Sequence, residues 1–287
     1  MSAQLEVARD SVNGSRRARI ERVASHVSRS IHRGWKLAAA RVALVALLLV
    51  AWQVVSTAGD LTFYLSTPGK VLSRLEQWLS DGTIQYNLRY TLRETLMGFA
   101  LGASLGLTIG LILGLKPFIA RTVEPVIIGL YSIPIIALAP LFVVWFGIGM
   151  GMKVALASVI VLFLTMFNTI SGVSNVDQEL LDVLRLMGAG RTRTLREVIL
   201  PSALTSIFIG LRTSVPYALI GAVTGEILTS NRGVGFLIMQ SSNQLDTAGV
   251  FAAILILSVV GTAIYMILRA SEGRLLRWKR AGHTPLQ

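Results

Sequence analysis

Long apolar stretches separated by short polar connections are the feature that most constrains the fold of this chain. A helix needs about 20 mostly apolar residues to cross the roughly 30 Å hydrocarbon layer of a membrane. Six stretches meet this length, at residues 37–58, 95–115, 123–146, 154–173, 203–228 and 249–268. Pro125, Pro134 and Pro140 interrupt the third, where they remove backbone donors. We therefore predict an all-α membrane protein with six transmembrane helices. The third is expected to be kinked, either lining a cavity or serving as a packing helix.

Composition excludes several classes of function. Hydrophobic residues make up 53% of the 287 residues and charged residues only 15%, which is typical of a protein solvated by lipid. Cysteine is absent, and the three histidines, His26, His32 and His283, fall in the polar tails. We expect no catalytic residue and no metal site. The net charge of +12 is carried beside the apolar stretches, which predicts contact with membrane lipids and not with nucleic acid.

The positions of lysine and arginine predict the orientation, because positive residues are retained on the cytoplasmic side. With six spans, 20 of the 27 fall on one side: nine from the N-terminus through Arg41, six in the connections after the second and fourth spans, and five from Arg269 onward. Six fall on the other side. Both termini are therefore expected in the cytoplasm. We predict a basic N-terminal tail (1–36), a transmembrane domain (37–270) and a C-terminal tail (271–287). The N-terminal tail is either a basic amphipathic helix on the membrane surface or a solvated, disordered segment.

The second span carries a glycine at every fourth position. The five are Gly98, Gly102, Gly106, Gly110 and Gly114, and together they form one small face along the helix. Close backbone approach along such a face is a usual source of helix pairing in membranes. We predict a packing device within the protein, with a subunit interface as the alternative.

The connection between the fourth and fifth spans, residues 174–202, has helical patterning of its own. Apolar residues recur on one face between Leu180 and Met187, which indicates a short amphipathic helix. Asp177 is expected to cap its start, and Gly188 with Gly190 to end it in the left-handed conformation. A second helix is expected from about Thr192, with the chain turning at Pro201. Connections of this length are usually functional, so docking to a partner is one interpretation. Lying on the headgroups or against the protein's own base is the other.

The same connection resembles the permease subunits of bacterial ATP-binding-cassette importers. Their motif is Glu-Ala-Ala, three residues, Gly, nine residues, an aliphatic residue, any residue and Leu-Pro. Here Asp182, Val183 and Leu184 occupy the first element, Gly188 follows three residues later, and Val198 precedes Leu200-Pro201 at the family spacing. Asp keeps the acid, whereas Val and Leu enlarge a surface that carries alanines in the family.

The resemblance extends from about residue 66 to 278 and is closest to the branch that imports nitrate, taurine and aliphatic sulfonates. The stretches that carry it are Thr67-Pro-Gly-Lys-Val-Leu, Tyr131-Ser-Ile-Pro-Ile-Ile-Ala-Leu-Ala-Pro-Leu, Trp145-Phe-Gly-Ile-Gly, Phe167-Asn-Thr-Ile-Ser-Gly-Val, Gly210-Leu-Arg, and Glu226 followed by Gly233-Val-Gly.

This resemblance implies a permease in the bacterial inner membrane that works as a dimer, expected to be a homodimer. A separate ATPase subunit would bind ATP and Mg, and a periplasmic or lipid-anchored solute-binding protein would deliver the cargo. The chain itself lacks the Gly-x-x-x-x-Gly-Lys-Ser/Thr loop that cradles phosphates, so it is expected to bind no cofactor. The resemblance assigns ATPase coupling to Asp182, Val183, Leu184, Gly188, Ala189, Arg193, Leu200 and Pro201.

Polar residues inside the spans are candidates for the translocation pathway, because they are costly in lipid. They are Ser132, Pro134, Asn168, Ser214 and Glu226. Hydrogen bonding between helices is the alternative for Ser132, which lies beside Pro134, and for Asn168 and Ser214. Glu226 would either shape an outer gate or face water. An ion-coupled secondary transporter or a channel is the alternative function. It would need a buried relay acid, a charged ring or a carbonyl filter.

Overall fold

The computed structural model describes residues 39–58 and 62–275, with side chains described as far as residue 273, and it divides into two units. The first unit ends at Pro68 and contains the helix Ala39–Thr57 and the short helix α2 (Thr62–Leu65). Within it, the indole N–H of Trp52 donates to the Leu65 carbonyl (3.2 Å) and the Thr62 hydroxyl donates to the Ser56 carbonyl (2.8 Å). Nearly all other side chains of Ala39–Thr57 are exposed, as expected for a helix in lipid. The predicted tail at 1–36 lies outside the described residues.

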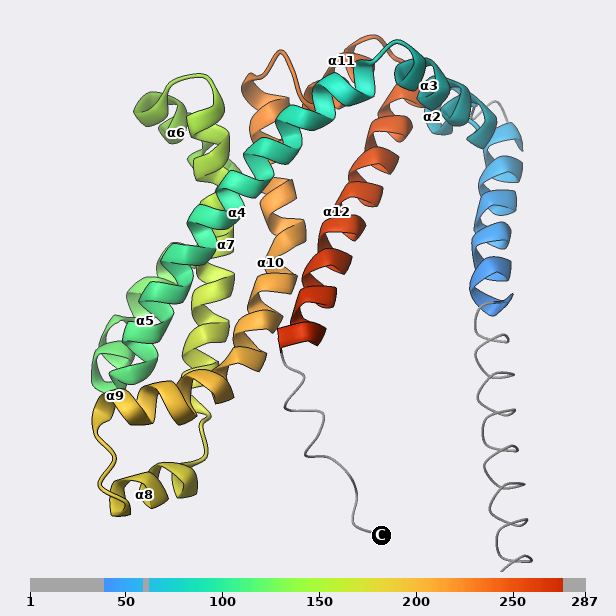
Figure 1. The fold of residues 1–287 in the computed structure, drawn as a ribbon. Helices are drawn as coiled ribbons and strands as arrows, with labels where there is room; N and C mark the ends of the chain where they lie inside the picture. The colour runs from blue at the N-terminus through green and yellow to red at the C-terminus, as the bar shows by residue number, and fades with distance from the viewer. Residues whose placement is uncertain (1–38, 59–61, 276–287) are drawn as a thin grey trace, which may run out of the picture. The chain divides into compact units, whose positions relative to one another are not determined.

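The second unit is helical throughout its described residues (Figure 1). Its elements are α3 (Pro68–Ser80), α4 (Thr83–Leu115), α5 (Pro117–Tyr131), the 3₁₀ turn η2 (Ile135–Leu138), α6 (Ala139–Phe146), α7 (Met150–Ser174), α8 (Gln178–Leu186), α9 (Arg191–Thr194), the π-helical turn η3 (Leu195–Ile199), α10 (Leu200–Thr229), α11 (Val234–Asn243) and α12 (Thr247–Leu275). Helix α12 therefore continues five residues into the predicted C-terminal tail.

Five helices are long and apolar enough to cross a membrane, and a sixth crossing is possible if one bent pair counts as a span. The five are Ala39–Thr57, α4, α7, the continuous helical run Arg191–Thr229 and α12. The bent pair is α5 with η2 and α6. The predicted all-α membrane fold is confirmed by this set.

Helices α4, α7 and α10 form the core of the second unit. A methyl group added at any glycine of the α4 stripe would lie less than 3.0 Å from an atom of α7, for example a backbone carbonyl oxygen at Gly102 and Gly106. Helix α10 packs on α7 in the same manner, because Gly221 approaches the backbone of Ala157. The predicted packing role of the stripe is confirmed, and the close backbone approach fixes α7 between its two neighbours.

The third predicted span is not one kinked helix. Helix α5 ends at Tyr131, and the segment Ile135–Phe146 leaves it at an angle of 81°. Pro134 lacks an N–H and disfavours helical backbone at the preceding residue, so the break falls at Ser132–Pro134. Beyond the break, Phe142 of α6 packs against Met152 and Leu156 of α7. Pro125 lies within α5 without breaking it.

The two ends of the bundle differ. One end carries α8, α9 and η3, which project from it and are together called the elbow (Figure 1). The other, called the α11 end, carries the short helix α11 and, through an ion pair between Arg74 and Asp246 (2.9 Å), the amphipathic helix α3.

Candidate functional site: a projecting elbow and a buried polar cluster

Helix α8 begins as the sequence predicts. The Asp177 carboxylate accepts a hydrogen bond from the backbone N–H of Glu179 (2.9 Å), and Glu179 places a second acid in the first turn. Both acids lie where the helix dipole favours negative charge. The cap fixes where the helix starts, and therefore which side chains share each of its faces.

The end of α8 is a left-handed turn at Gly188, whose φ is +73°. The N–H of Gly188 donates to the Arg185 carbonyl (3.0 Å) and that of Ala189 to the Leu184 carbonyl (2.9 Å), the hydrogen-bond pair of a Schellman motif. Gly190 does not share this conformation: its φ of −69° and ψ of 162° are extended, as is usual for the residue that precedes a helix. The prediction was right for Gly188 and wrong for Gly190.

Pro201 does not end the second elbow helix, which runs without a break from Arg191 into α10. Pro201 lies in the first turn of α10, and the turn before it is π-helical. Pro201 has no N–H to donate to the carbonyl of Glu197, so the regular α-helical pattern is interrupted there. In the widened turn the N–H of Leu200 donates to the carbonyl of Leu195, five residues back. The chain changes direction across this turn as it leaves the elbow (Figure 1).

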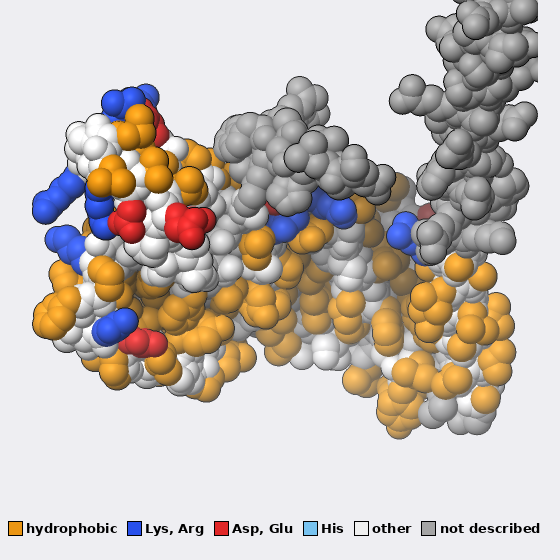
Figure 2. All heavy atoms as spheres, turned by 90° about the horizontal axis from the view of Figure 1, so that it is seen from below, with side chains coloured by type: hydrophobic (Ala, Val, Ile, Leu, Met, Phe, Trp, Pro, Cys, Tyr) orange, Lys and Arg blue, Asp and Glu red, His pale blue; other side chains and the backbone are white. Residues whose placement is uncertain are grey.

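Helix α8 buries none of its residues. Leu186 and Met187 are 89% and 75% exposed, and the predicted apolar face includes the half-exposed Leu180. Figure 2 shows charged side chains gathered over the elbow beside these uncovered apolar ones. Two exposed ion pairs connect the charges: Arg185 with Asp182 (2.8 Å) and Arg193 with Glu197 (3.0 Å). The described residues leave Leu186 and Met187 uncovered, whereas Leu181 and Leu184 on the same helix are half-buried.

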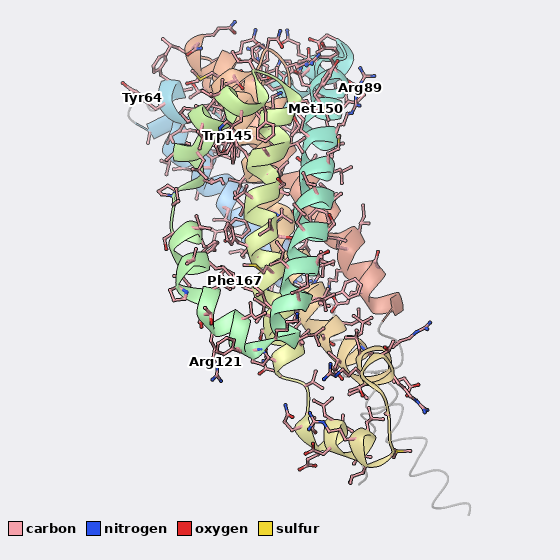
Figure 3. The ribbon with its side chains drawn as sticks, turned by 90° about the vertical axis from the view of Figure 1, so that its left-hand side faces the viewer. Tyr64, Arg89, Arg121, Trp145, Met150 and Phe167 are labelled. Atoms are coloured by element: carbon pink, nitrogen blue, oxygen red, sulfur yellow. The ribbon has the colours of Figure 1, made fainter. Side chains whose placement is uncertain are left out.

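A cavity of about 590 Å³ lies beside the elbow. It is lined by the ends of α4, α5 and α7 together with α8, and the lining includes Arg121, Glu124, Phe167, Leu181 and Arg185. Figure 3 shows Arg121 and Phe167 on this side of the protein, where α5 stands apart from α7. Helices α5 and α8 therefore both line this cavity.

The five predicted pathway positions are not brought together. The hydroxyls of Ser132 and Ser214 and the amide of Asn168 each donate to a carbonyl of their own helix (2.8–2.9 Å). Ser132 and Pro134 are exposed at the break after α5, whereas Ser214 is buried. Asn168 packs against Gly210 of α10. Because these hydrogen bonds stay within one helix, they do not bear out the alternative of hydrogen bonding between helices, and a role in the pathway stays a prediction.

Glu226 does not face water, because its exposed fraction is 0%. One carboxylate oxygen accepts from the Thr91 hydroxyl (2.7 Å) and the other from the backbone N–H of Gly235 (2.7 Å). The Thr91 oxygen in turn accepts from the N–H of Val234 (2.8 Å), and the Asn87 side-chain oxygen accepts from the N–H of Gly233 (2.8 Å). Side chains of α4 and α10 thus satisfy the free N–H groups at the start of α11.

A buried ion pair completes this polar cluster. The Lys153 ammonium of α7 donates to the Glu94 carboxylate of α4 (2.7 Å) and to the Ser230 hydroxyl (3.0 Å), and the Lys153 and Glu94 side chains are each 3% exposed. Sequence reasoning missed the pair, because Lys153 directly precedes the predicted fourth span (154–173) and counts among the six positive residues assigned to the outer side. A signal was present, since Asn87, Thr91 and Glu94 continue the inward face of the glycine stripe at helical spacing.

Arg212 is a further charged residue within a membrane-spanning helix. It pairs with Glu272 of α12 (2.8 Å), and the two side chains are 22% and 17% exposed. The pair joins α10 to α12 near the elbow end, and it explains how a charge at this depth is tolerated.

Comparison with known proteins identifies the family. The family model described as "Binding-protein-dependent transport system inner membrane component" matches residues 106–277. The riboflavin transport system permease protein RibX of Chloroflexus aurantiacus is 36% identical over 81% of this chain and 87% of its own length. The putative aliphatic sulfonates transport permease protein SsuC of Bacillus subtilis is 32% identical over 83% and 87%. The formylaminopyrimidine transport permease protein ThiX of Halalkalibacterium halodurans is 36% identical over 56% and 65%.

Solved structures agree on the fold. A chain of the MetNI methionine ABC transporter, in an inward-facing conformation, matches 70% of this chain and 95% of its own length with a TM-score of 0.57 and 20% identity. The family membership favours an importer over the alternative of an ion-coupled transporter or channel. The chain belongs to the inner-membrane components of binding-protein-dependent transport systems, and it is a membrane-spanning permease subunit of an ATP-binding-cassette importer.

Proposed function

We propose that this subunit moves a small solute inward by alternating access, driven by a separate ATPase subunit that binds ATP and Mg and docks on the elbow. The observation that carries the proposal is the uncovered apolar surface of α8, which ends in Leu186 and Met187. A capped, rigid helix with exposed apolar side chains at the tip of a projection is suited to insertion into a groove of a partner. The docking set proposed from the sequence is Asp182, Val183, Leu184, Gly188, Ala189, Arg193, Leu200 and Pro201.

The proposal places the elbow and both termini in the cytoplasm of a bacterial cell, with the α11 end outside. The excess of positive residues in the tails and around the elbow supports this orientation. Because the chain has no cysteine, single cysteines at Ala189 and at Ser80 can be tested with a membrane-impermeant maleimide. Labelling of Ser80→Cys but not Ala189→Cys in intact cells is expected, and the reverse result would overturn the orientation.

A second copy of the subunit is proposed to cover α5. This helix buries none of its residues, and its exposed side chains include Phe118, Val126 and Tyr131. Two such helices facing each other would enclose the pathway, with Ser132 and Pro134 on its wall. A homodimer is expected because nothing in the pathway proposal requires a different second chain.

For the solute we propose a sulfonate or taurine first, since relatives named for both transport systems align over most of this chain. A nitrogen heterocycle is the second candidate. It is favoured by the 36% identity to the riboflavin and formylaminopyrimidine permeases. The cargo is proposed to reach the α11 end on a solute-binding protein.

The test is uptake of labelled taurine, an alkanesulfonate, nitrate, riboflavin and formylaminopyrimidine by cells that lack the gene and by cells in which it is restored. A third strain keeps the gene but carries a catalytically inactive ATPase subunit. Loss of one uptake in both defective strains, with recovery on restoration, names the solute and supports ATP-driven import. Uptake that depends on this gene but survives in the ATPase-deficient strain would contradict the proposal.

A further inference from the structure

The outward face of α4 at the α11 end carries an unusual side-chain stripe. Tyr86, Arg89, Tyr90 and Arg93 follow one another at spacings of three and four residues, so they lie along one side of the first turns of the helix. Tyr86, Arg89 and Arg93 are exposed and Tyr90 is half-buried. Figure 3 shows Arg89 pointing away from the bundle. Within the described residues, the stripe apart from Tyr90 is therefore left exposed.

Arg232, in the connection between α10 and α11, joins the stripe. Its guanidinium carbon lies 4.4 Å from the centroid of the Tyr90 ring, and that of Arg89 lies 5.6 Å from the same ring. Tyr86 meets Tyr90 edge to face at 5.2 Å. The cation–π contacts orient both guanidinium groups without neutralising them. We call these five residues the tyrosine–arginine patch.

Hydrogen bonds of the buried polar cluster fix the position of the backbone that carries the patch. Asn87 and Thr91, on the inward side of the same helical turns, bind the backbone of Gly233 and Val234. The Ser230 hydroxyl accepts from Lys153 and donates to the carbonyl of Arg232 (2.5 Å). The loop that presents Arg232 is therefore fixed to α4 and α7, so little conformational freedom is lost when the patch binds a partner.

The length of α4 places the patch outside the hydrocarbon layer. Its 33 residues span about 50 Å at 1.5 Å per residue, whereas the layer is about 30 Å thick. If the apolar residues 96–115 fill that layer, Arg89 lies about 10 Å and Tyr86 about 15 Å beyond its edge along the helix. The headgroup region adds only about 5–8 Å on each side. Most of the patch is therefore presented to water.

The charge of the patch defines the chemistry of its partner. Among the ion pairs of the described residues, none includes Arg89, Arg93 or Arg232. The two nearest buried acids, Glu94 and Glu226, are engaged with Lys153 and with the start of α11. Arginine binds carboxylates in a bidentate fashion, and arginine and tyrosine are enriched at the energetic centres of protein interfaces.

We propose that the tyrosine–arginine patch is the surface on which an acidic face of the solute-binding protein docks when it delivers its cargo. The inference rests on the proposed function, because it takes the α11 end to be the outer face. It goes beyond that function by naming the contact residues and the charge of the partner surface. Positive charge that projects past the headgroups favours a soluble acidic protein over lipid.

The test uses the assembled importer with its ATPase subunits in phosphatidylcholine nanodiscs and the purified binding protein loaded with the solute found by uptake. ATP hydrolysis is measured against binding-protein concentration. For the double variant R89E/R232E we expect the half-saturating concentration to rise about ten-fold or more, with an unchanged maximal rate. Added salt should raise this concentration for the wild type and much less for the variant. The control is Lys70→Glu, a single charge reversal outside the patch, and it is compared with the single variant Arg89→Glu.

A second pair of variants tests the aromatic component. Tyr90→Phe keeps the ring beneath the two guanidinium groups and should leave the half-saturating concentration unchanged, whereas Tyr90→Leu should raise it.

A half-saturating concentration that is the same for the wild type and R89E/R232E would overturn the proposal. So would a defect of R89E/R232E seen only after phosphatidylglycerol is added, because the patch would then bind lipid. If the wild type shows no stimulation at all, the proposed function fails instead.

Discussion

The two ends of the bundle use charged residues in opposite ways. At the elbow, Asp182 and Arg185 form an ion pair with side chains 61% and 70% exposed, beside the apolar Leu186 and Met187, which the described residues leave exposed. At the α11 end, Glu94 and Lys153 form an ion pair with both side chains 3% exposed, within a network that joins four helices. The difference fits the proposal that the elbow is a docking surface for the ATPase subunit. The α11 end, in contrast, is fixed from within.

The largest expected effect comes from breaking the buried pair. Lys153→Met leaves the Glu94 charge buried without a partner, which typically costs about 3–5 kcal/mol of unfolding free energy. The double variant E94L/K153M removes both charges and should recover most of that loss. Thermal unfolding of the purified subunit in detergent measures both. A double variant that is no more stable than Lys153→Met would show that the pair itself, and not an orphaned charge, determines stability at this end.

The next effect concerns the glycine stripe that connects the two ends. A Cβ atom added at Gly106 would lie about 2.5 Å from the Leu162 carbonyl oxygen. Gly106→Val adds this atom and two methyl groups, so α4 and α7 must separate. Overpacking of this kind costs about 1–3 kcal/mol or more. Gly69→Ala, at a position with nothing within 4 Å, is the control and should leave the unfolding temperature unchanged. Equal stability of the two variants would contradict the close contact of α4 with α7.

The smallest effect is expected at the elbow. Asp182→Ala removes an exposed ion pair of the i, i+3 type, which contributes at most about 0.5 kcal/mol to unfolding free energy. The same measurement that detects Lys153→Met should therefore barely detect Asp182→Ala. A large loss of stability in Asp182→Ala would contradict the contrast between the α11 end, which buried contacts hold in place, and the elbow, whose contacts are exposed.

The sequence predicts the features that depend on neighbours along one helix. The cap at Asp177, the turn at Gly188 and the small face of α4 follow from local spacing, and the structure confirms each. The effect of a proline on a helix does not follow from local spacing alone, because it depends on what packs nearby. At Pro134 the helix breaks with an angle of 81°, whereas at Pro201 the helix continues through a preceding π-helical turn.

The sequence does not reveal contacts between distant segments. Glu94 and Lys153 are 59 residues apart, and Thr91 and Glu226 are 135 residues apart, so no periodicity pairs them. Hydropathy places such charges in loops, because an isolated charge is costly in a span. Only the packing of α4 against α7 and α10 shows that Glu94 pairs with Lys153 and that Glu226 accepts a hydrogen bond from Thr91.

The central claim is that the elbow transmits the work of the ATPase to the spans, and one pair of variants tests it most directly. Gly188→Val forces a β-branched residue into a backbone with φ +73°, whereas Gly190→Val, two residues away, meets an extended backbone and open space. Solute uptake and ATP hydrolysis are measured together in reconstituted vesicles. We predict that Gly188→Val loses most solute transported per ATP while still inserting and folding, and that Gly190→Val transports as the wild type does. Equal coupling in the two variants would contradict the account.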